Sequence, residues 1–179
     1  MSAMKVLLLI ADGFEEIEAI TTIDVLRRAD IDVTIAGFTS YVTGAHGIKI
    51  NADKKIDSLN PKKYVALVLP GGPGCISFSK STTVMNIIKD FNKDNKIIAA
   101  ICAAPLLLVK AGILEDKEAV VYPGYERYIP KIRSGDVIVD KNIITSKGPG
   151  TAMAFALKLV EILAGKEKML KLKQELIVK

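Results

Sequence analysis

The chain has 179 residues, of which 50% are hydrophobic and 25% charged, so it is long enough to bury a core and too apolar to be intrinsically disordered. Its 2 cysteines cannot form the disulfide framework of a small secreted protein, and its 1 histidine excludes a histidine-rich metal site. The net charge of +5 indicates a solvated surface rather than a specific nucleic-acid partner, because no basic stripe with interleaved aromatic residues accompanies it.

The apolar run at residues 6–11 is the only feature near the start that resembles a targeting or membrane segment. A span needs about 20 apolar residues, and the acidic residues that follow at once include no small-residue cleavage site. We therefore expect a buried strand there, no membrane partner and a cytoplasmic location, where both thiols stay reduced. The length predicts a single domain over residues 1–179.

In chain order, the hydrophobic pattern predicts a strand at residues 5–10, a helix at 15–28, a strand at 31–38, a turn with a short strand within 44–53, a loop or short helix at 58–63, a strand at 65–69, a glycine-rich turn at 70–74, a helix at 82–95, a strand at 96–101 and a helix at 103–111. Short strands follow at 119–122 and 136–140, then a core strand at 142–146, a helix at 148–163 with Gly165 as its C-cap, and a basic amphipathic helix. This alternation predicts an α/β fold, with helices on both faces of a parallel sheet.

Ligands of such sheets bind beyond the carboxyl ends of the strands, so the segments to examine are 12–18, 71–75, 102–104, Tyr122 and 146–150. A dinucleotide site is not expected, because the first strand–helix turn carries acids where a pyrophosphate needs glycines. The glycine-rich turn at 70–74 lacks the lysine of a P-loop. A receiver domain is also not expected, because Pro70 and Gly71 stand where its phosphoacceptor aspartate would be.

Cys102 stands between a strand and the helix after it, flanked by small residues, as in a nucleophile elbow. A helix N-terminus lowers the pKa of a cysteine, so we expect a thiolate there. Backbone N–H groups at this turn and at the Gly71–Gly72 turn are candidate donors to an oxyanion. The alternative is that Cys102 only packs as a small apolar residue.

Carboxylates near Cys102 would favour a reactive role. Glu15, Glu16 and Glu18 all lie at or near the start of the first helix. Glu15 and Glu16 are expected to complement the positive end of the helix dipole. Glu18 lies among apolar residues, where burial would raise the pKa of its carboxyl and suit it to transfer protons.

Five motifs in order along the chain carry a family resemblance: residues 11–18 (ADGFEEIE), 24–28 (DVLRR), 69–72 (LPGG), 99–105 (AAICAAP) and 145–151 (TSKGPGT). On these motifs the chain resembles the ThiJ/PfpI superfamily, in the branch of the Parkinsonism-associated deglycase and its bacterial ThiJ-like relatives. The resemblance implies a flavodoxin-like, three-layer fold with a mostly parallel sheet and a nucleophile elbow. It also implies a homodimer.

The resemblance further implies that Cys102 is the nucleophile and Glu18 its protonated carboxylic acid partner. Backbone N–H groups of Gly72 and Ala103 would form the oxyanion site, with Gly71, Tyr122 and Ser146 also lining the substrate pocket. The activity it implies is conversion of methylglyoxal-like 2-oxoaldehydes to 2-hydroxy acids, without glutathione, cofactor or metal, or a related deglycase reaction.

Two alternatives stay open at this point. Oxidation of Cys102 would make the protein an oxidative-stress sensor with chaperone or partner-binding output. A cysteine peptidase or amidase is the weaker alternative, because many relatives carry a histidine where this chain has Tyr122, and His46 falls in a hairpin instead. Cys75 follows the glycine-rich turn and is either a resolving thiol for Cys102 or a small residue in a tight loop.

Overall fold

The computed structural model describes residues 4–179. Within that range the main sheet consists of β1 (Lys5–Ile10), β2 (Asp32–Gly37), β5 (Lys54–Lys55), β6 (Ala66–Leu69), β7 (Ile97–Ile101), β10 (Val137–Asp140) and β11 (Ile143–Ser146). Their order across the sheet is β10-β11-β7-β6-β1-β2-β5. Neighbouring strands are parallel except β10, which runs antiparallel to β11.

Two short pairs of strands lie outside this sheet. They are the antiparallel hairpin of β3 (Tyr41–Thr43) with β4 (Lys49–Asn51), and the parallel pair of β8 (Glu118–Ala119) with β9 (Lys131–Ile132). Short 3₁₀ turns complete the connections: η1 (Ile56–Ser58), η2 (Pro61–Lys63), η3 (Glu126–Tyr128) and η4 (Pro149–Thr151).

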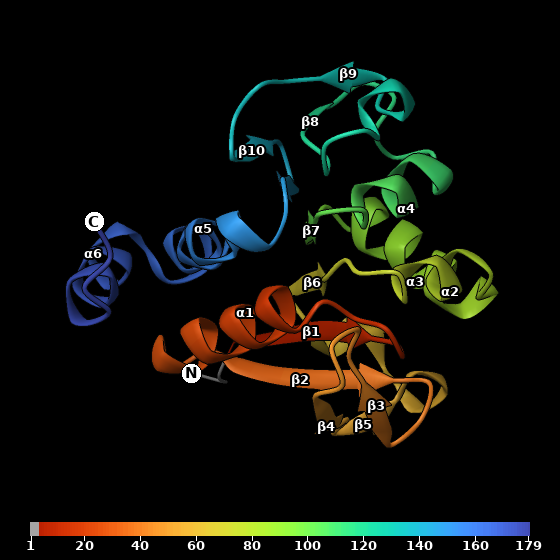
Figure 1. Ribbon diagram of the computed structural model, residues 1–179, viewed down its shortest axis with the longest axis horizontal. Coiled ribbons are helices and arrows are strands. Elements are labelled where there is room, and N and C mark those ends of the chain that lie inside the picture. Colours follow the sequence, from red (N-terminus) through yellow and green to blue (C-terminus); the bar gives the residue numbers. More distant parts are fainter. Residues whose placement is uncertain (1–3) are drawn as a thin grey trace.

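Helices cover both faces of the sheet (Figure 1). One face carries α1 (Glu16–Arg28), α5 (Ala152–Ala164) and α6 (Lys166–Glu175). The other carries α2 (Cys75–Ser79), α3 (Thr82–Lys93) and α4 (Pro105–Lys110). The three layers and the mostly parallel sheet confirm the predicted α/β fold.

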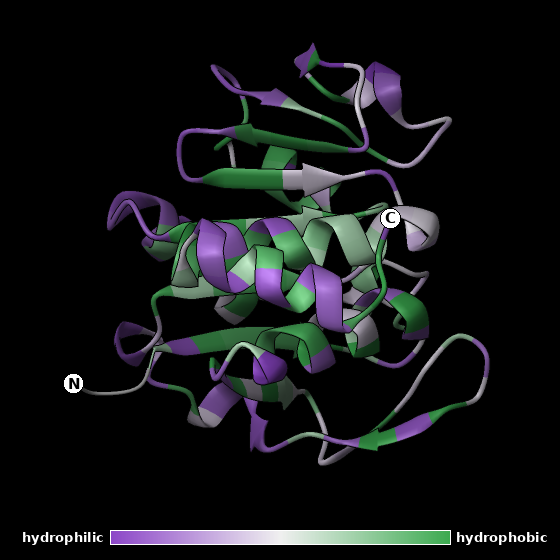
Figure 2. Cartoon of the chain, turned by 90° about the vertical axis from the view of Figure 1, so that its left-hand side faces the viewer, coloured by the Kyte–Doolittle hydropathy of each residue, from purple (hydrophilic) through white to green (hydrophobic). Residues whose placement is uncertain are grey.

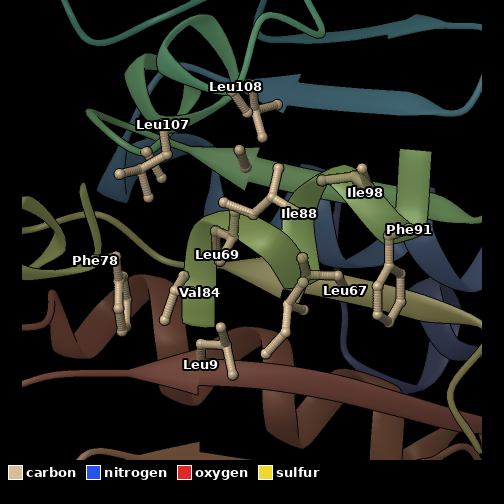
Figure 3. Close-up of a cluster of buried hydrophobic side chains, with 14 of the residues drawn as sticks. Leu9, Leu67, Leu69, Phe78, Val84, Ile88, Phe91, Ile98, Leu107 and Leu108 are labelled. Carbon is tan, nitrogen blue, oxygen red and sulfur yellow. The ribbon is translucent and has the colours of Figure 1, made fainter. Parts of the chain in front are cut away.

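The core is divided between the two faces of the sheet, because successive side chains of a strand point to opposite sides. In β1, Val6, Leu8 and Ile10 pack towards α1 and α5, while Leu7 and Leu9 pack towards α2, α3 and α4. Figure 3 shows the second cluster, in which strand leucines meet aromatic and aliphatic side chains of the three helices. The strands of the main sheet are mostly hydrophobic along their length, as expected for strands covered on both sides (Figure 2).

Most predicted strands and helices match their ranges to within one or two residues, but three expectations are wrong. The helix predicted at 148–163 begins only at Ala152, because Pro149–Thr151 forms the 3₁₀ turn η4. The helix predicted at 103–111 begins only at Pro105, because residues 102–104 form a turn. The strand predicted at 119–122 is shorter and lies earlier, because β8 contains only Glu118 and Ala119. The short helix α2 and the strand β3 were not predicted, since elements of 5 and 3 residues are too short to show a periodicity. The single-domain organisation stays a prediction, and between residues 4 and 179 no helix is long and apolar enough to cross a membrane.

Candidate active site

The predicted site residues meet at the carboxyl edge of the sheet. Gly71 and Gly72 follow β6, Cys102 follows β7, and Glu18 lies in the first turns of α1, the helix that follows β1. The three strands are adjacent in the sheet. Because parallel strands end at the same edge, residues from three distant parts of the sequence come together there.

Cys102 occupies the sharp turn predicted for a nucleophile elbow. Its φ is +67°, a left-handed conformation that costs a residue with a side chain roughly 1–2 kcal/mol. The turn is held on both sides: the Cys102 N–H donates to the Ser146 carbonyl at 2.9 Å, and the Cys102 carbonyl accepts from the Tyr122 N–H at 2.9 Å. Strain held by its surroundings in this way is common at functional sites.

The backbone N–H groups of Gly72 and Ala103 lie beside the Cys102 sulfur and act to lower the pKa of its thiol. Gly72 has a φ of +88°, and a Cβ on it would lie 2.5 Å from the Gly13 carbonyl oxygen. Only glycine fits this position. The turn after β6 can therefore lie against the turn after β1, with the Gly72 N–H beside the Cys102 sulfur. The two donors are the pair expected for the oxyanion site.

Glu18 is fully buried and faces Cys102. Its Oε2 accepts a hydrogen bond from the Gly71 N–H at 2.7 Å. Its Oε1 is buried and has no hydrogen-bond partner among residues 4–179. Because an unpaired charged oxygen is costly to bury, a proton on Oε1 stabilises the carboxyl in this position.

The surroundings shift the pKa of both groups. Burial raises the pKa of Glu18 from 4.5 to about 7, as predicted. Burial, together with the facing Glu18 carboxylate, raises the pKa of Cys102 to about 12, against the lowering by the Gly72 and Ala103 N–H groups. The expectation of an acidified thiol is therefore wrong, because burial and the Glu18 carboxylate raise the pKa of Cys102 more than the backbone N–H groups lower it. The two groups interact closely, so the pair loses its first proton near neutral pH and keeps the second until far higher pH.

A cavity of about 610 Å³ opens in front of Cys102. Its lining includes the predicted residues Gly72, Ala103 and Tyr122, and also Glu15, Pro73, Cys75, Ile76, Ser79, Leu106, Leu107, Lys110, Tyr125 and Pro149. Tyr122 packs against Gly148, where an added Cβ would lie 3.1 Å from the tyrosine ring. Tyr122 is thus a wall of the cavity that also holds the elbow through its backbone.

Two predicted site residues have different roles from those expected. The Ser146 hydroxyl does not line the cavity: it is fully buried and is bonded to the Asp136 carbonyl at 2.7 Å and to the Thr151 hydroxyl at 2.6 Å. Ser146 serves instead through its carbonyl, which holds the Cys102 N–H. Gly71 also gives no donor to a substrate, because its N–H is taken by Glu18.

The second thiol, Cys75, lies in the wall of the same cavity and is nearly buried. Burial raises its pKa to about 11, so it carries little thiolate at neutral pH. A resolving role for Cys75 stays a prediction.

His46 and the first two glutamates form a separate group beside the site. Glu15 caps α1 by accepting from the Ile17 N–H at 3.4 Å, as expected of an acid at a helix start. Glu16 instead anchors the turn of the β3–β4 hairpin, accepting from the His46 N–H at 2.6 Å and contacting its ring Nδ1 at 2.9 Å. The hydrogen bond that the His46 ring makes to the Glu16 carboxylate raises the pKa of His46. Ligand atoms of these residues lie within 4.8 Å of one another, but the hydrogen bonds of Glu16 explain the arrangement without a metal.

Comparison with known proteins agrees with this geometry. A model of the DJ-1/PfpI family matches residues 4–162. The chain belongs to the DJ-1/PfpI family. This confirms the resemblance seen in the sequence motifs.

Among its DJ-1/PfpI relatives is the glutathione-independent glyoxalase DJR-1.2 of Caenorhabditis elegans, which is 37% identical over 174 residues, covering 94% of each chain. A deglycase of Pyrococcus abyssi is 33% identical over 167 residues, covering 89% of this chain and 99% of the relative. The solved structure of oxidised Toxoplasma gondii DJ-1 superposes with a TM-score of 0.94 at 38% identity, covering 98% of each chain.

Sequence reasoning missed several residues of the cavity. Leu106, Leu107 and Lys110 follow Ala103 at the spacing of one helix face, a signal that was available in the sequence. Tyr125 and Ile76 gave no such signal, because they lie in a loop and in a helix of 5 residues.

Proposed function

We propose that this chain is a cofactor-independent glyoxalase that converts methylglyoxal-like 2-oxoaldehydes to 2-hydroxy acids. The observation that carries the proposal is the position of the Cys102 sulfur, which lies beside the backbone N–H groups of Gly72 and Ala103 and faces a buried glutamate whose pKa is raised to about 7. A family relative in Caenorhabditis elegans is named a glutathione-independent glyoxalase. A related deglycase reaction is the variant of this proposal that the name of the Pyrococcus abyssi relative supports.

In the first step, the Cys102 sulfur adds to the aldehyde carbon and a hemithioacetal forms. The proton that the Cys102–Glu18 pair still holds ends on Glu18, because the sulfur becomes bonded to carbon. The aldehyde oxygen gains negative charge and is stabilised by the N–H groups of Gly72 and Ala103. These donors are backbone groups held by the fold, so little reorganisation accompanies the charge development.

In the second step, Glu18 first gives the proton from the sulfur to the aldehyde oxygen, which leaves a neutral hemithioacetal and a free carboxylate. The carboxylate then takes the proton of the former aldehyde carbon and delivers it to the neighbouring carbonyl carbon through an enediol, while the hydroxyl proton of the first carbon passes to the oxygen of the second. The first carbon is oxidised and the second reduced, so no external electron acceptor is needed. The product is a thioester of Cys102 with the 2-hydroxy acid. Water then cleaves the thioester, releases the acid and restores the thiol.

The proposal is tested by chiral analysis of lactate formed from methylglyoxal by the purified protein, without glutathione and with EDTA present. We expect lactate of a single hand from the wild type and none above background from Cys102→Ala. No lactate from well-folded wild type would reject the glyoxalase.

Oxidation of Cys102 is the second candidate function. The N–H groups of Gly72 and Ala103 and the Glu18 carboxyl are also placed to stabilise sulfinate oxygens on this sulfur, and a relative from Toxoplasma gondii has been solved in an oxidised form. Intact-mass analysis after mild peroxide treatment is the test. A stable gain of two oxygens at Cys102, with no prior turnover of aldehydes, would favour a sensor over an enzyme.

We also propose that the protein is a homodimer, and that its partner covers α1. Ile17 and Ile20 are 55% and 39% exposed on α1, and Ile48 is 53% exposed in the β3–β4 turn, which Glu16 ties to α1 through the Ile48 N–H. Exposed apolar side chains gathered in this way mark interaction surfaces. Light scattering should give the mass of two chains for the wild type and of one for Ile17→Glu, and a monomeric wild type would reject the dimer.

A further inference from the structure

The cavity in front of Cys102 follows one face of α4. Leu106, Leu107 and Lys110 of α4 line it, and their spacing of three and four residues places them on one side of the helix. At the rise of an α-helix, Leu106 and Lys110 are separated by about 6 Å along α4. The cavity therefore extends well beyond the atoms that react at Cys102.

The walls of this extension are apolar and aromatic. Leu106 and Leu107 come from α4, Ile76 from α2, and Tyr125 from the segment after β8. Tyr125 lies with its ring centre 6.5 Å from that of Tyr122, so two aromatic rings stand side by side along the cavity. Surfaces of this kind bind apolar or aromatic groups in preference to water.

The volume of the cavity exceeds what a triose aldehyde occupies. At about 610 Å³, it lies within the range of roughly 300–1,000 Å³ typical of sites that enclose drug-sized ligands. Methylglyoxal fits at Cys102 and leaves the apolar extension filled only with water. A substrate with a larger apolar body would bury that surface.

Charge is distributed unevenly along the cavity. Among residues 4–179, the acidic side chain that lines it is Glu15, whose N–H donates to the Gly71 carbonyl at 3.0 Å and which therefore lies at the Cys102 end. The basic side chain that lines it is Lys110, at the far end of α4. Lys110 is exposed and takes part in none of the ion pairs of the described residues.

We propose that the preferred substrates are 2-oxoaldehydes whose carbonyl groups are joined, through an apolar ring-sized body, to an anionic group. The aldehyde lies at Cys102, the body packs between Leu106 and Tyr125, and the anion reaches Lys110. Glu15 disfavours the reverse orientation, because it repels an anion from the Cys102 end. This inference rests on the proposed glyoxalase activity and specifies its substrate class.

The first test compares kcat/KM for methylglyoxal, phenylglyoxal and 4-carboxyphenylglyoxal at low ionic strength. We expect phenylglyoxal to exceed methylglyoxal about tenfold, and the carboxylated compound to exceed phenylglyoxal about threefold, the size of an exposed charge pair. In Lys110→Gln the ratio of kcat/KM for the carboxylated compound to that for phenylglyoxal should fall to about one, and in Lys110→Glu it should fall below one. Lys89→Gln, which changes an exposed lysine on α3, is the matched control and should keep the wild-type ratio.

The apolar walls are tested by Ile76→Ala, which should reduce the ratio of phenylglyoxal to methylglyoxal about threefold. Val139→Ala removes a similar, 42% exposed side chain from β10 and should leave that ratio unchanged. Binding is measured separately on Cys102→Ala, with 4-acetylbenzoate and acetophenone as unreactive ketones. The carboxylate should bind more tightly, and its advantage should disappear when Lys110→Gln is added.

The outcomes separate this inference from the function on which it rests. Turnover of methylglyoxal with equal rates for all three aldehydes, or a carboxylate preference that survives Lys110→Gln, overturns the substrate class and leaves the glyoxalase standing. Absence of turnover for every aldehyde overturns the glyoxalase and the substrate class together.

Discussion

Gly71 donates its N–H to Oε2 of Glu18 at 2.7 Å and leaves no space for a side chain of its own. A Cβ on Gly71 would lie 2.6 Å from Cβ of Cys102 and 2.9 Å from Oε2 of Glu18. The nucleophile and the carboxyl are therefore brought together across a residue that has no side chain. This explains why a glycine without a substrate contact belongs to the site.

Gly71→Ala should disrupt this pair. The added methyl group has to displace Cys102 or Glu18, so we expect kcat/KM for methylglyoxal to fall at least 100-fold and the free energy of unfolding to fall by about 1–3 kcal/mol. Gly150→Ala is the matched control, because nothing lies within 4 Å of a Cβ there. Activity of Gly71→Ala close to that of the wild type would contradict the proposed packing of the pair.

Glu18→Gln should separate proton transfer from nucleophilic attack. A glutamine keeps the shape of the side chain but cannot accept the proton, so turnover should fall by about 10²–10⁴, the usual contribution of a general acid–base. Cys102 should still be alkylated by iodoacetamide, which mass spectrometry can follow. Turnover within a few fold of the wild type would show that Glu18 does not move the proton.

The sequence predicted which residues form the site more accurately than it predicted their pKa values. Cys102, Glu18, Gly72 and Ala103 were all identified from motifs, because residues at the ends of parallel strands have few possible positions. The pKa of Cys102 was predicted in the wrong direction, because it depends on how deeply the thiol is buried and on how closely the Glu18 carboxylate faces it. Neither quantity can be read from the residues alone.

Ser146 and Lys110 also show what the sequence could not predict. Ser146 was expected to line the pocket and its hydroxyl does not, whereas Lys110 was not expected to line it and does. Ser146 is the last residue of a core strand at the correct edge, and only the structure reveals that its hydroxyl turns away to Asp136 and Thr151. Lys110 was not singled out from the sequence, and only the structure shows that the cavity extends along α4 to reach it. The positions of strands along the chain follow from the hydrophobic pattern, whereas the direction of a single side chain depends on contacts distant in the sequence.

Activity should rise with pH as the Cys102–Glu18 pair loses its first proton. The pKa of Glu18 is raised to about 7, and below that value the carboxyl cannot accept the proton that the sulfur gives up. We therefore expect kcat/KM to increase about tenfold between pH 6 and pH 8, as measured in buffers of constant ionic strength. A profile that is flat or falling over this range would contradict the assignment.

The free energy of unfolding should depend on the same ionisation of Glu18, but in the opposite direction: it should fall as the pH rises. The carboxyl ionises near 4.5 when unfolded and near 7 when folded, so its burial destabilises the folded state above pH 7 and has no such effect below pH 4.5. Glu18→Gln should therefore be more stable than the wild type at pH 8, by at most about 3 kcal/mol. Urea unfolding at pH 8 and pH 4.5 is the measurement. If the difference in the free energy of unfolding between Glu18→Gln and the wild type does not decrease at pH 4.5, burial of the charged carboxylate is not its cause.

The central claim is that Cys102, and not the other thiol of the same cavity, converts a 2-oxoaldehyde to a 2-hydroxy acid. The most direct measurement is the rate of lactate formation from methylglyoxal by wild type, Cys102→Ser and Cys75→Ser, followed by nuclear magnetic resonance. We predict that Cys102→Ser makes no lactate above background and that Cys75→Ser stays within a few fold of the wild type. Substantial lactate from folded Cys102→Ser would contradict the mechanism.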